Sequence, residues 1–176
     1  FDKALNCDRV SAFGGIIAFN KKLSVETAKK IKDLFIEVVI APGFLTESKQ
    51  ILSQKKNLVL IQYNLGKNKT SLHVKTTRNF LLLQNRDNKI ISKKDLTIKT
   101  KIKPTAGEKD DMIFGFIVAK YLNSNAIVLA KNFTTVGIGV GQMNRLESAK
   151  QAIRLMKSNF NKCIPIMASD GFFPFP

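Results

Sequence analysis

The sequence predicts an α/β protein built from two α/β units joined by an irregular connector rich in lysine and asparagine. Apolar runs and amphipathic segments alternate in residues 10–62 and again in residues 105–176, whereas the stretch between them is polar and lysine-rich. We place the first unit at approximately residues 1–75, the connector at 76–104 and the second unit at 105–176. In residues 10–62 the strands and helices follow one another in β-α-β-α-β order, which is typical of helices covering a largely parallel sheet.

The composition supports a folded core. The chain has 176 residues, of which 44% are hydrophobic and 24% charged, and the apolar residues are spread along its whole length. This excludes intrinsic disorder. The longest apolar stretches, such as Ile127–Ala130, are far shorter than the roughly 20 residues that a membrane-spanning helix needs. We therefore expect a protein that has no membrane partner.

Each element of the first unit has a local sequence signal. The apolar runs that we expect as strands are residues 10–20, 36–40 and 58–62. Ser24 is a typical N-cap for a helix through Phe35, and Thr46 for a second, shorter helix. The pair Gly14-Gly15 interrupts the first strand, which indicates a close approach of backbone or ligand at that point.

The connector and the second unit follow. From Tyr63 to Pro104 the pattern is polar except at Phe80–Leu83, with turn signals at residues 64–66 and 86–88, so we expect an irregular or hairpin-like segment. Beyond it, helices are predicted over residues 108–122 and 144–156, and strands over residues 125–130, 135–138 and 163–167.

The chain is strongly basic, with 29 Lys and Arg residues against 13 Asp and Glu residues and a formal net charge of +16. Of the basic residues, 24 are lysine, whereas proteins that read base edges depend on the bidentate fork of arginine. The lysines are scattered and interleaved with asparagine, as in Lys67-Asn68-Lys69, which favours a solvated surface and no nucleic-acid partner. The alternative is a basic α/β module that binds nucleic acid, with an affinity that falls steeply as salt is raised.

Few residues suit metal or nucleophilic chemistry. The two cysteines, Cys7 and Cys163, make no disulfide framework and cannot hold zinc by themselves, so we expect a cytoplasmic protein with no metal site. The single histidine, His73, lies in the lysine-rich middle of the chain, where a surface position is the usual one. The sequence contains neither a nucleophile-elbow serine nor the signature of zinc deaminases.

The first candidate site is a strand that runs through Gly137, Gly139 and Gly141 into a helix beginning near Arg145. Such a turn lets backbone N–H groups and the start of a helix approach an anion. The glycine spacing matches neither the dinucleotide fingerprint nor a P-loop, so a tight structural turn and a phosphate site are both open. Arg145 favours a ligand, because an arginine at the start of a helix interacts poorly with the helix dipole.

Three further segments contain residues that could belong to a functional site. Asn125 precedes an apolar strand, where its amide could steady a developing oxyanion or simply form a turn. Glu37 lies within an apolar strand, where a carboxylate needs a hydrogen-bond donor. The loop over residues 168–176 holds three phenylalanines, which are costly to expose. They could pack on a flat ligand ring, on a partner subunit or in the core of the chain, and of these three we favour the core. From these residues alone the sequence predicts an α/β domain that binds a small anionic ligand.

Six segments together resemble one family. They are SAFGGIIAFN (11–20), EVVIAPGF (37–44), QKKNL (54–58), SNAIVLAKN (124–132), TVGIGVGQMNR (135–145) and MASDGFFPFP (167–176). Their order and spacing resemble the transformylase part of the bifunctional AICAR transformylase/IMP cyclohydrolase family. A single glycine motif would be unspecific, whereas six motifs in register are specific. The resemblance implies three-layer, cytidine-deaminase-like α/β/α units without zinc.

The resemblance also implies a reaction of de novo purine biosynthesis. A formyl group passes from the cosubstrate 10-formyltetrahydrofolate to the 5-amine of AICAR (5-aminoimidazole-4-carboxamide ribonucleotide). By similarity, the positions that match AICAR contacts of the family are Gly14, Glu37, Asn125, Arg145 and Phe172. Asn125 would also support catalysis, and Leu146 matches a position that contacts folate. The family further implies a homodimer in which two subunits share each site.

Parts of the family pattern have no match in this sequence. The catalytic Lys-His pair of the family belongs upstream of Ser11, and an aspartate belongs two residues after the FFPF segment, beyond Pro176. Residues 78–82 also lack the glycine pair that the family carries in this strand. We therefore expect the 176 residues alone to be inactive in formyl transfer, and IMP cyclohydrolase activity to reside in an N-terminal domain of the full-length protein.

Overall fold

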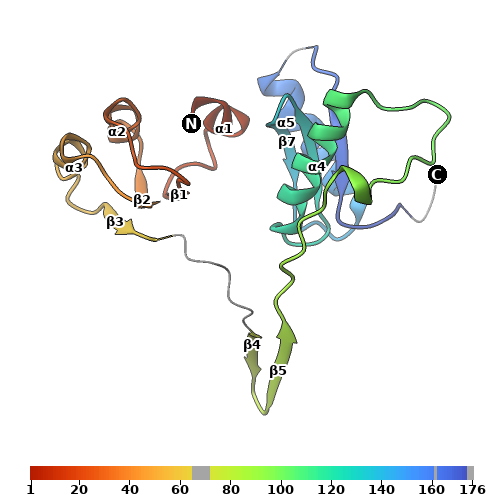
Figure 1. The fold of residues 1–176 in the computed structure, drawn as a ribbon, viewed down its shortest axis with the longest axis horizontal. Coiled ribbons are helices and arrows are strands. Elements are labelled where there is room, and N and C mark those ends of the chain that lie inside the picture. Colours follow the sequence, from red (N-terminus) through yellow and green to blue (C-terminus); the bar gives the residue numbers. More distant parts are fainter. Residues whose placement is uncertain (65–71, 161, 174–176) are drawn as a thin grey trace. The chain divides into compact units, whose positions relative to one another are not determined.

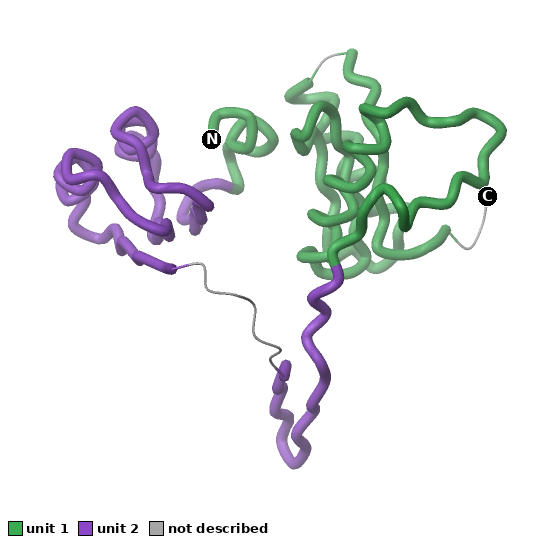
Figure 2. The backbone as a smooth tube through the Cα atoms, in the orientation of Figure 1, with its two compact units in different colours: residues 1–11, 90–176 green, residues 12–89 purple. Residues whose placement is uncertain are grey.

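The computed structural model describes residues 1–64, 72–160 and 162–173. They form two compact units (Figure 2): the parallel unit, residues 12–89, and the antiparallel unit, residues 1–11 with 90–176. Each unit combines helices with a three-stranded sheet, parallel in one and antiparallel in the other (Figure 1). The predicted α/β class is thereby confirmed. None of the helices in the described ranges is long and apolar enough to cross a bilayer.

The parallel unit follows the predicted order of strands and helices. Its elements are β1 (Gly15–Ala18), α2 (Val25–Lys32), β2 (Ile36–Ala41), α3 (Thr46–Leu52) and β3 (Val59–Gln62), with the strands in the order β1-β2-β3. The Ser24 hydroxyl accepts a hydrogen bond from the Thr27 N–H at 3.3 Å and caps α2, as predicted. The prediction for Thr46 is wrong: a parallel bridge between Leu23 and Phe44 keeps the chain extended up to Leu45, which is the N-cap of α3.

A β-hairpin follows this sheet in the chain. β4 (Leu72–Thr77) and β5 (Phe80–Asn85) pair antiparallel, with Thr77 opposite Phe80, so the chain turns at residues 78–79. Every residue of the two strands is exposed. Residues 86–88 are irregular and form no turn, and the turn expected at residues 64–66 lies largely outside the described part of the chain.

The antiparallel unit contains a sheet in the order β7-β6-β8. Its elements are α1 (Asp2–Cys7), η1 (Lys93–Asp95), α4 (Ala106–Lys120), β6 (Ile127–Lys131), β7 (Thr134–Gly139), α5 (Arg145–Asn159) and β8 (Ile166–Ser169). Helix α1 has no counterpart among the predictions. β8 begins later than the predicted residue 163, because Pro165 has no N–H to donate to a strand ladder.

β6 is buried on both faces of this sheet. Ile127 and Leu129 pack with α5, whereas Val128 packs with Ala119 of α4. Since successive side chains of a strand point to opposite faces, α5 and α4 cover opposite faces of the sheet, with α5 running beside β7 (Figure 1). This explains why the run Ile127–Ala130 is apolar without alternation.

Candidate functional site

The candidate site lies at one edge of the antiparallel sheet, where β6 begins and β7 and β8 end. Ile127 at the start of β6 pairs with Gly139 at the end of β7 and with Ser169 at the end of β8. The segments that precede β6 and follow the other two strands therefore meet at this edge. They bring Asn125 and Phe172 toward the first residue of α5, which is Arg145.

Arg145 connects the start of α5 to the loop after β8. Its Nη2 donates to Asp170 Oδ1 at 3.1 Å, and its Nη1 donates to the Phe172 carbonyl oxygen at 2.9 Å. The Arg145 and Asp170 side chains are only 19% and 15% exposed, so water screens this ion pair incompletely. The Arg145 Nε also donates a longer hydrogen bond to Asp170 Oδ1, at 3.4 Å. The hydrogen bonds in the described part of the chain thus use three of the five guanidinium N–H groups. Among the described residues, two of its N–H donors have no partner and can bond to a ligand.

Asp170 is a residue of this site that the sequence did not predict. Its Oδ1 also accepts a hydrogen bond from the Ala126 N–H at 3.1 Å, and its own N–H donates to the Ala126 carbonyl oxygen at 3.2 Å. Burial raises the pKa of this carboxyl, but hydrogen bonds from Ser124, Ala126 and Arg145, with the charge of Arg145, lower the pKa overall. Asp170 is therefore ionised at neutral pH. The sequence feature that could have identified Asp170 is its position directly after an apolar strand, where a carboxylate needs hydrogen-bond donors.

Asn125 is held by its side chain and by its backbone. Its Nδ2 donates to the Gln142 carbonyl oxygen at 2.9 Å. Its own carbonyl oxygen accepts hydrogen bonds from the buried Ser148 hydroxyl at 2.8 Å and from the Gly141 N–H at 3.1 Å. Asn125 is thereby fixed relative to α5, and Oδ1 is the amide atom able to accept a hydrogen bond from a ligand. The sequence did not predict the contributions of Gln142 and Ser148.

The glycine run of residues 137–141 serves largely to pack α5 against β7. A Cβ added at Gly139 would lie 2.6 Å from the carbonyl carbon of Ser148, and one at Gly137 would clash with the carbonyl oxygen of Ala152. Real Cβ atoms essentially never come closer than 3.0 Å. Gly141 differs, because its φ is +67° and nothing lies within 4 Å of an added Cβ. Helix packing thus explains two of the three glycines without a bound phosphate.

Large apolar side chains near this edge are exposed: Phe172 by 81%, Leu146 by 57% and Phe173 by 40%. The prediction that the aromatic loop fills the core is therefore wrong for both of these phenylalanines. The bonds of Arg145 hold the loop backbone at the sheet edge, and the two rings lie at the surface. Residues 174–176 of the same loop lie outside the described residues. An exposed ring offers a face on which a heteroaromatic ligand can stack.

Gly14 and Glu37 lie beside each other in the parallel unit. The Gly14 N–H donates to the Phe35 carbonyl oxygen at 2.8 Å, its φ is +70°, and a Cβ there would lie 3.5 Å from Glu37 Oε1. The rings of Phe13 and Phe35 stack with their centroids 4.6 Å apart. Glu37 is exposed, so its carboxylate can accept hydrogen bonds from solvent. The predicted site residues are thus divided between the two units.

The remaining chemistry-bearing residues are dispersed. Cys7 and Cys163 are free thiols. Burial raises the pKa of Cys7; a hydrogen bond with Thr135 opposes this effect and the charge of Asp8 adds to it. His73 is exposed on β4. Within residues 1–64, 72–160 and 162–173, no three His, Cys, Asp or Glu side chains lie close enough together to hold a metal ion.

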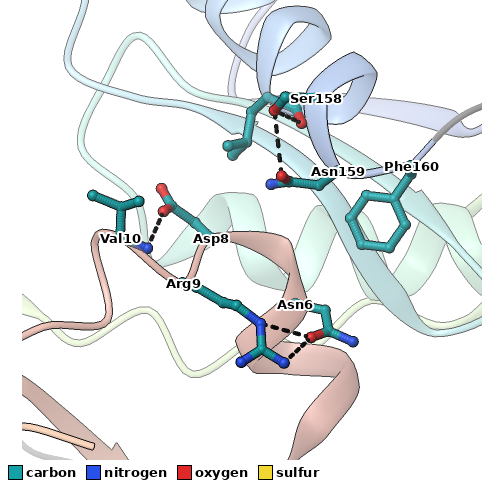
Figure 3. A pocket seen from close by; sticks show the side chains of 8 residues that line it. Asn6, Asp8, Arg9, Val10, Ser158, Asn159 and Phe160 are labelled. Carbon is teal, nitrogen blue, oxygen red and sulfur yellow. Dashed lines mark hydrogen bonds between the residues drawn. The ribbon is translucent and has the colours of Figure 1, made fainter.

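A separate surface depression of about 450 Å³ lies where α1 meets the C-terminal end of α5 (Figure 3). Its polar lining residues bond to neighbours: Arg9 donates two hydrogen bonds to Asn6 Oδ1, and Asp8 Oδ1 accepts one from the Val10 N–H. The depression contains none of the residues predicted for the site, which lies at the other end of α5.

Comparisons with known proteins agree with the resemblance. The family model described as AICARFT/IMPCHase bienzyme matches residues 1–155. The bifunctional purine biosynthesis protein PurH of Fusobacterium nucleatum subsp. nucleatum is 42% identical over an alignment that covers 99% of this chain and 34% of that protein. The chain therefore spans about a third of the length of the curated relative it matches.

Proposed function

The chain belongs to the AICARFT/IMPCHase bienzyme family, and we propose that it forms part of a formyltransferase of purine biosynthesis. The reaction transfers a formyl group from the cosubstrate 10-formyltetrahydrofolate to the 5-amine of AICAR. The amine nitrogen forms a bond to the formyl carbon, and the bond between that carbon and N10 of the folate breaks. The amine loses a proton and N10 gains one, so the products are formyl-AICAR and tetrahydrofolate.

The observation that supports the proposal best is the hydrogen-bond network that gathers Asn125, Arg145 and the backbone of Phe172 at one sheet edge. The 5-amine is conjugated with a carboxamide and is a weak nucleophile. The enzyme must therefore hold it against the formyl carbon and stabilise the oxyanion that forms. Asn125 supplies a fixed amide for the carboxamide and the reacting amine. Arg145 supplies two N–H donors and a positive charge, and the Phe172 ring supplies a stacking face.

The other proposed contacts follow the same chemistry. Gly14 allows the backbone to approach the nucleotide closely, and Glu37 accepts hydrogen bonds from ribose hydroxyls. Leu146, next to Arg145 on α5, makes an apolar contact with the folate. We assign removal of the amine proton to no residue of this chain, because the family's Lys-His pair has no match in it.

Further features belong to the same proposal. The units are cytidine-deaminase-like α/β/α layers without zinc, and the helices on both faces of the antiparallel sheet support this assignment. The enzyme is a cytoplasmic homodimer whose subunits share each site. IMP cyclohydrolase activity resides in another part of the longer protein.

The test is formyl transfer by the full-length protein that contains this sequence. Arg145→Gln should lower kcat/KM for AICAR by about tenfold or more, since a lost hydrogen bond from a charged group costs about 1.5–3 kcal/mol. Asn125→Ala should lower it by about two- to tenfold, since a lost hydrogen bond between neutral groups costs about 0.5–1.5 kcal/mol. Asp110→Asn is the control: it removes the 2.6 Å ion pair between Asp110 and Lys93, neither of which belongs to the site. No formyl transfer by the wild-type protein, or full activity of the Asn125 variant, would contradict the proposal.

A further inference from the structure

We propose that Asp170 is a positioning residue for formyl transfer, which orients Arg145 directly and Asn125 through Ala126. This rests on the proposed function, because it concerns the same substrates and the same site. The proposal rests on the position of the Asp170 carboxylate between three elements. Asp170 directly follows β8, and its carboxylate is hydrogen-bonded to Ala126, which precedes β6, and to Arg145, the first residue of α5.

The carboxylate holds the Arg145 guanidinium in one orientation. Arg145 is the first residue of α5, where the partial positive charge of the helix N-terminus disfavours a cation. Asp170 Oδ1 offsets that charge and accepts from Nη2 at 3.1 Å and from Nε at 3.4 Å. With Nη1 bonded to the Phe172 carbonyl oxygen, the guanidinium is held on two sides. Its two remaining N–H donors are therefore presented in a fixed direction.

The same oxygen holds the start of β6. Ala126 and Asp170 exchange two hydrogen bonds, of 3.1 Å to Oδ1 and 3.2 Å between backbone atoms. Ala126 is fully buried and Asn125 precedes it in the chain, so the bonds to Asp170 restrain the backbone of Asn125 in addition to its own bonds to Gln142 and Ser148. Because Arg145 and Ala126 share one acceptor atom, the separation of the Arg145 and Asn125 side chains depends on Asp170.

Asp111 provides a structural comparison at the opposite edge of the sheet. Asp111 is 5% exposed, and its carboxylate accepts hydrogen bonds from the N–H groups of Asn132 and Phe133, at 2.9 and 2.8 Å, in the turn between β6 and β7. It is thus a buried carboxylate that holds backbone N–H groups, and its hydrogen bonds to the described residues go to this turn and not to the candidate site. A general loss of packing would appear in variants of both aspartates, whereas a positioning effect would appear only at Asp170.

The experiment measures steady-state kinetics of the full-length protein carrying Asp170→Asn, Arg145→Gln, both changes together, or Asp111→Asn. Asparagine keeps an oxygen for the Ala126 N–H but removes the charge that holds Arg145. We expect Asp170→Asn to raise KM for AICAR by about 10- to 100-fold, the range that corresponds to losing the charge-assisted hydrogen bonding that orients Arg145. KM for the folate should change little. The double variant should be no worse than Arg145→Gln alone, because the two residues act as one unit, and Asp111→Asn should leave KM for AICAR unchanged.

The outcomes separate the two proposals. If Arg145→Gln raises KM for AICAR and Asp170→Asn does not, or if the two losses multiply in the double variant, the positioning role of Asp170 is overturned alone. If Arg145→Gln has no effect, the role of Arg145 in the proposed function fails first and this inference fails with it. Should the asparagine variant not fold, Asp170→Glu retains the charge one methylene further out, and an unchanged KM for AICAR in that variant overturns the positioning role.

Discussion

Replacing Gly139 with alanine should loosen α5 from the sheet. An added Cβ would lie 2.6 Å from the carbonyl carbon and 2.9 Å from the Cα of Ser148, inside the closest approach of real Cβ atoms. The atoms in the way belong to helix backbone, which cannot rotate aside as a side chain can, so α5 must shift relative to β7. Overpacking of this kind costs about 1–3 kcal/mol. We expect about 3 kcal/mol, because the shift also strains the buried bond from Ser148 to Asn125.

Hydrogen exchange, followed by mass spectrometry on peptides from β7 and α5, measures this loss locally. A loss of about 3 kcal/mol corresponds to amide exchange roughly 100-fold faster where opening of this packing governs exchange. Gly107→Ala is the matched control, since Gly107 lies in α4, nothing lies within 4 Å of an added Cβ, and alanine favours a helix by about 1 kcal/mol. Wild-type exchange rates in Gly139→Ala would refute the argument that helix packing requires this glycine.

Three further predictions concern single side chains. Asp111→Ala removes the carboxylate that accepts from the N–H groups of residues 132–133, so the free energy of unfolding measured in urea should fall by about 2–3 kcal/mol, and an unchanged value would contradict this. The pKa of Asp170 is lowered in the folded protein, so its ion pair stabilises the fold above the ordinary carboxyl pKa of 3.8, and this stability is lost as the pH falls through the folded pKa. An NMR titration of the carboxyl carbon should show a midpoint below 3.8, and a midpoint above it would refute the pairing. Because burial raises the pKa of Cys7, iodoacetamide at a pH of about 8 should alkylate Cys163 faster than Cys7; faster labelling of Cys7 in tryptic peptides would show that its burial is not maintained.

Sequence signals were sufficient where residues close together in the chain decide the structure. The cap at Ser24 and the order of strands and helices in the parallel unit depend on hydrophobic spacing and on local hydrogen bonds, and both were predicted. Thr46 failed as a cap because a bridge to Leu23, far back in the chain, extends the backbone before α3. The exposure of Phe172 also escaped prediction, since its backbone is bonded to Arg145, 27 residues away.

The sequence by itself determined the α/β class, the approximate position of most helices and strands, and the family, because hydrophobic periodicity and motif order are properties of the chain. It also singled out Asn125 and Arg145 as candidates. Only the tertiary structure decided that β6 pairs antiparallel with both β7 and β8, and that Asp170 joins Arg145 to Ala126. The physical reason is that the bond between Ala126 and Asp170 spans 44 residues of sequence, and a hydrogen bond at that separation leaves no mark on local residue spacing.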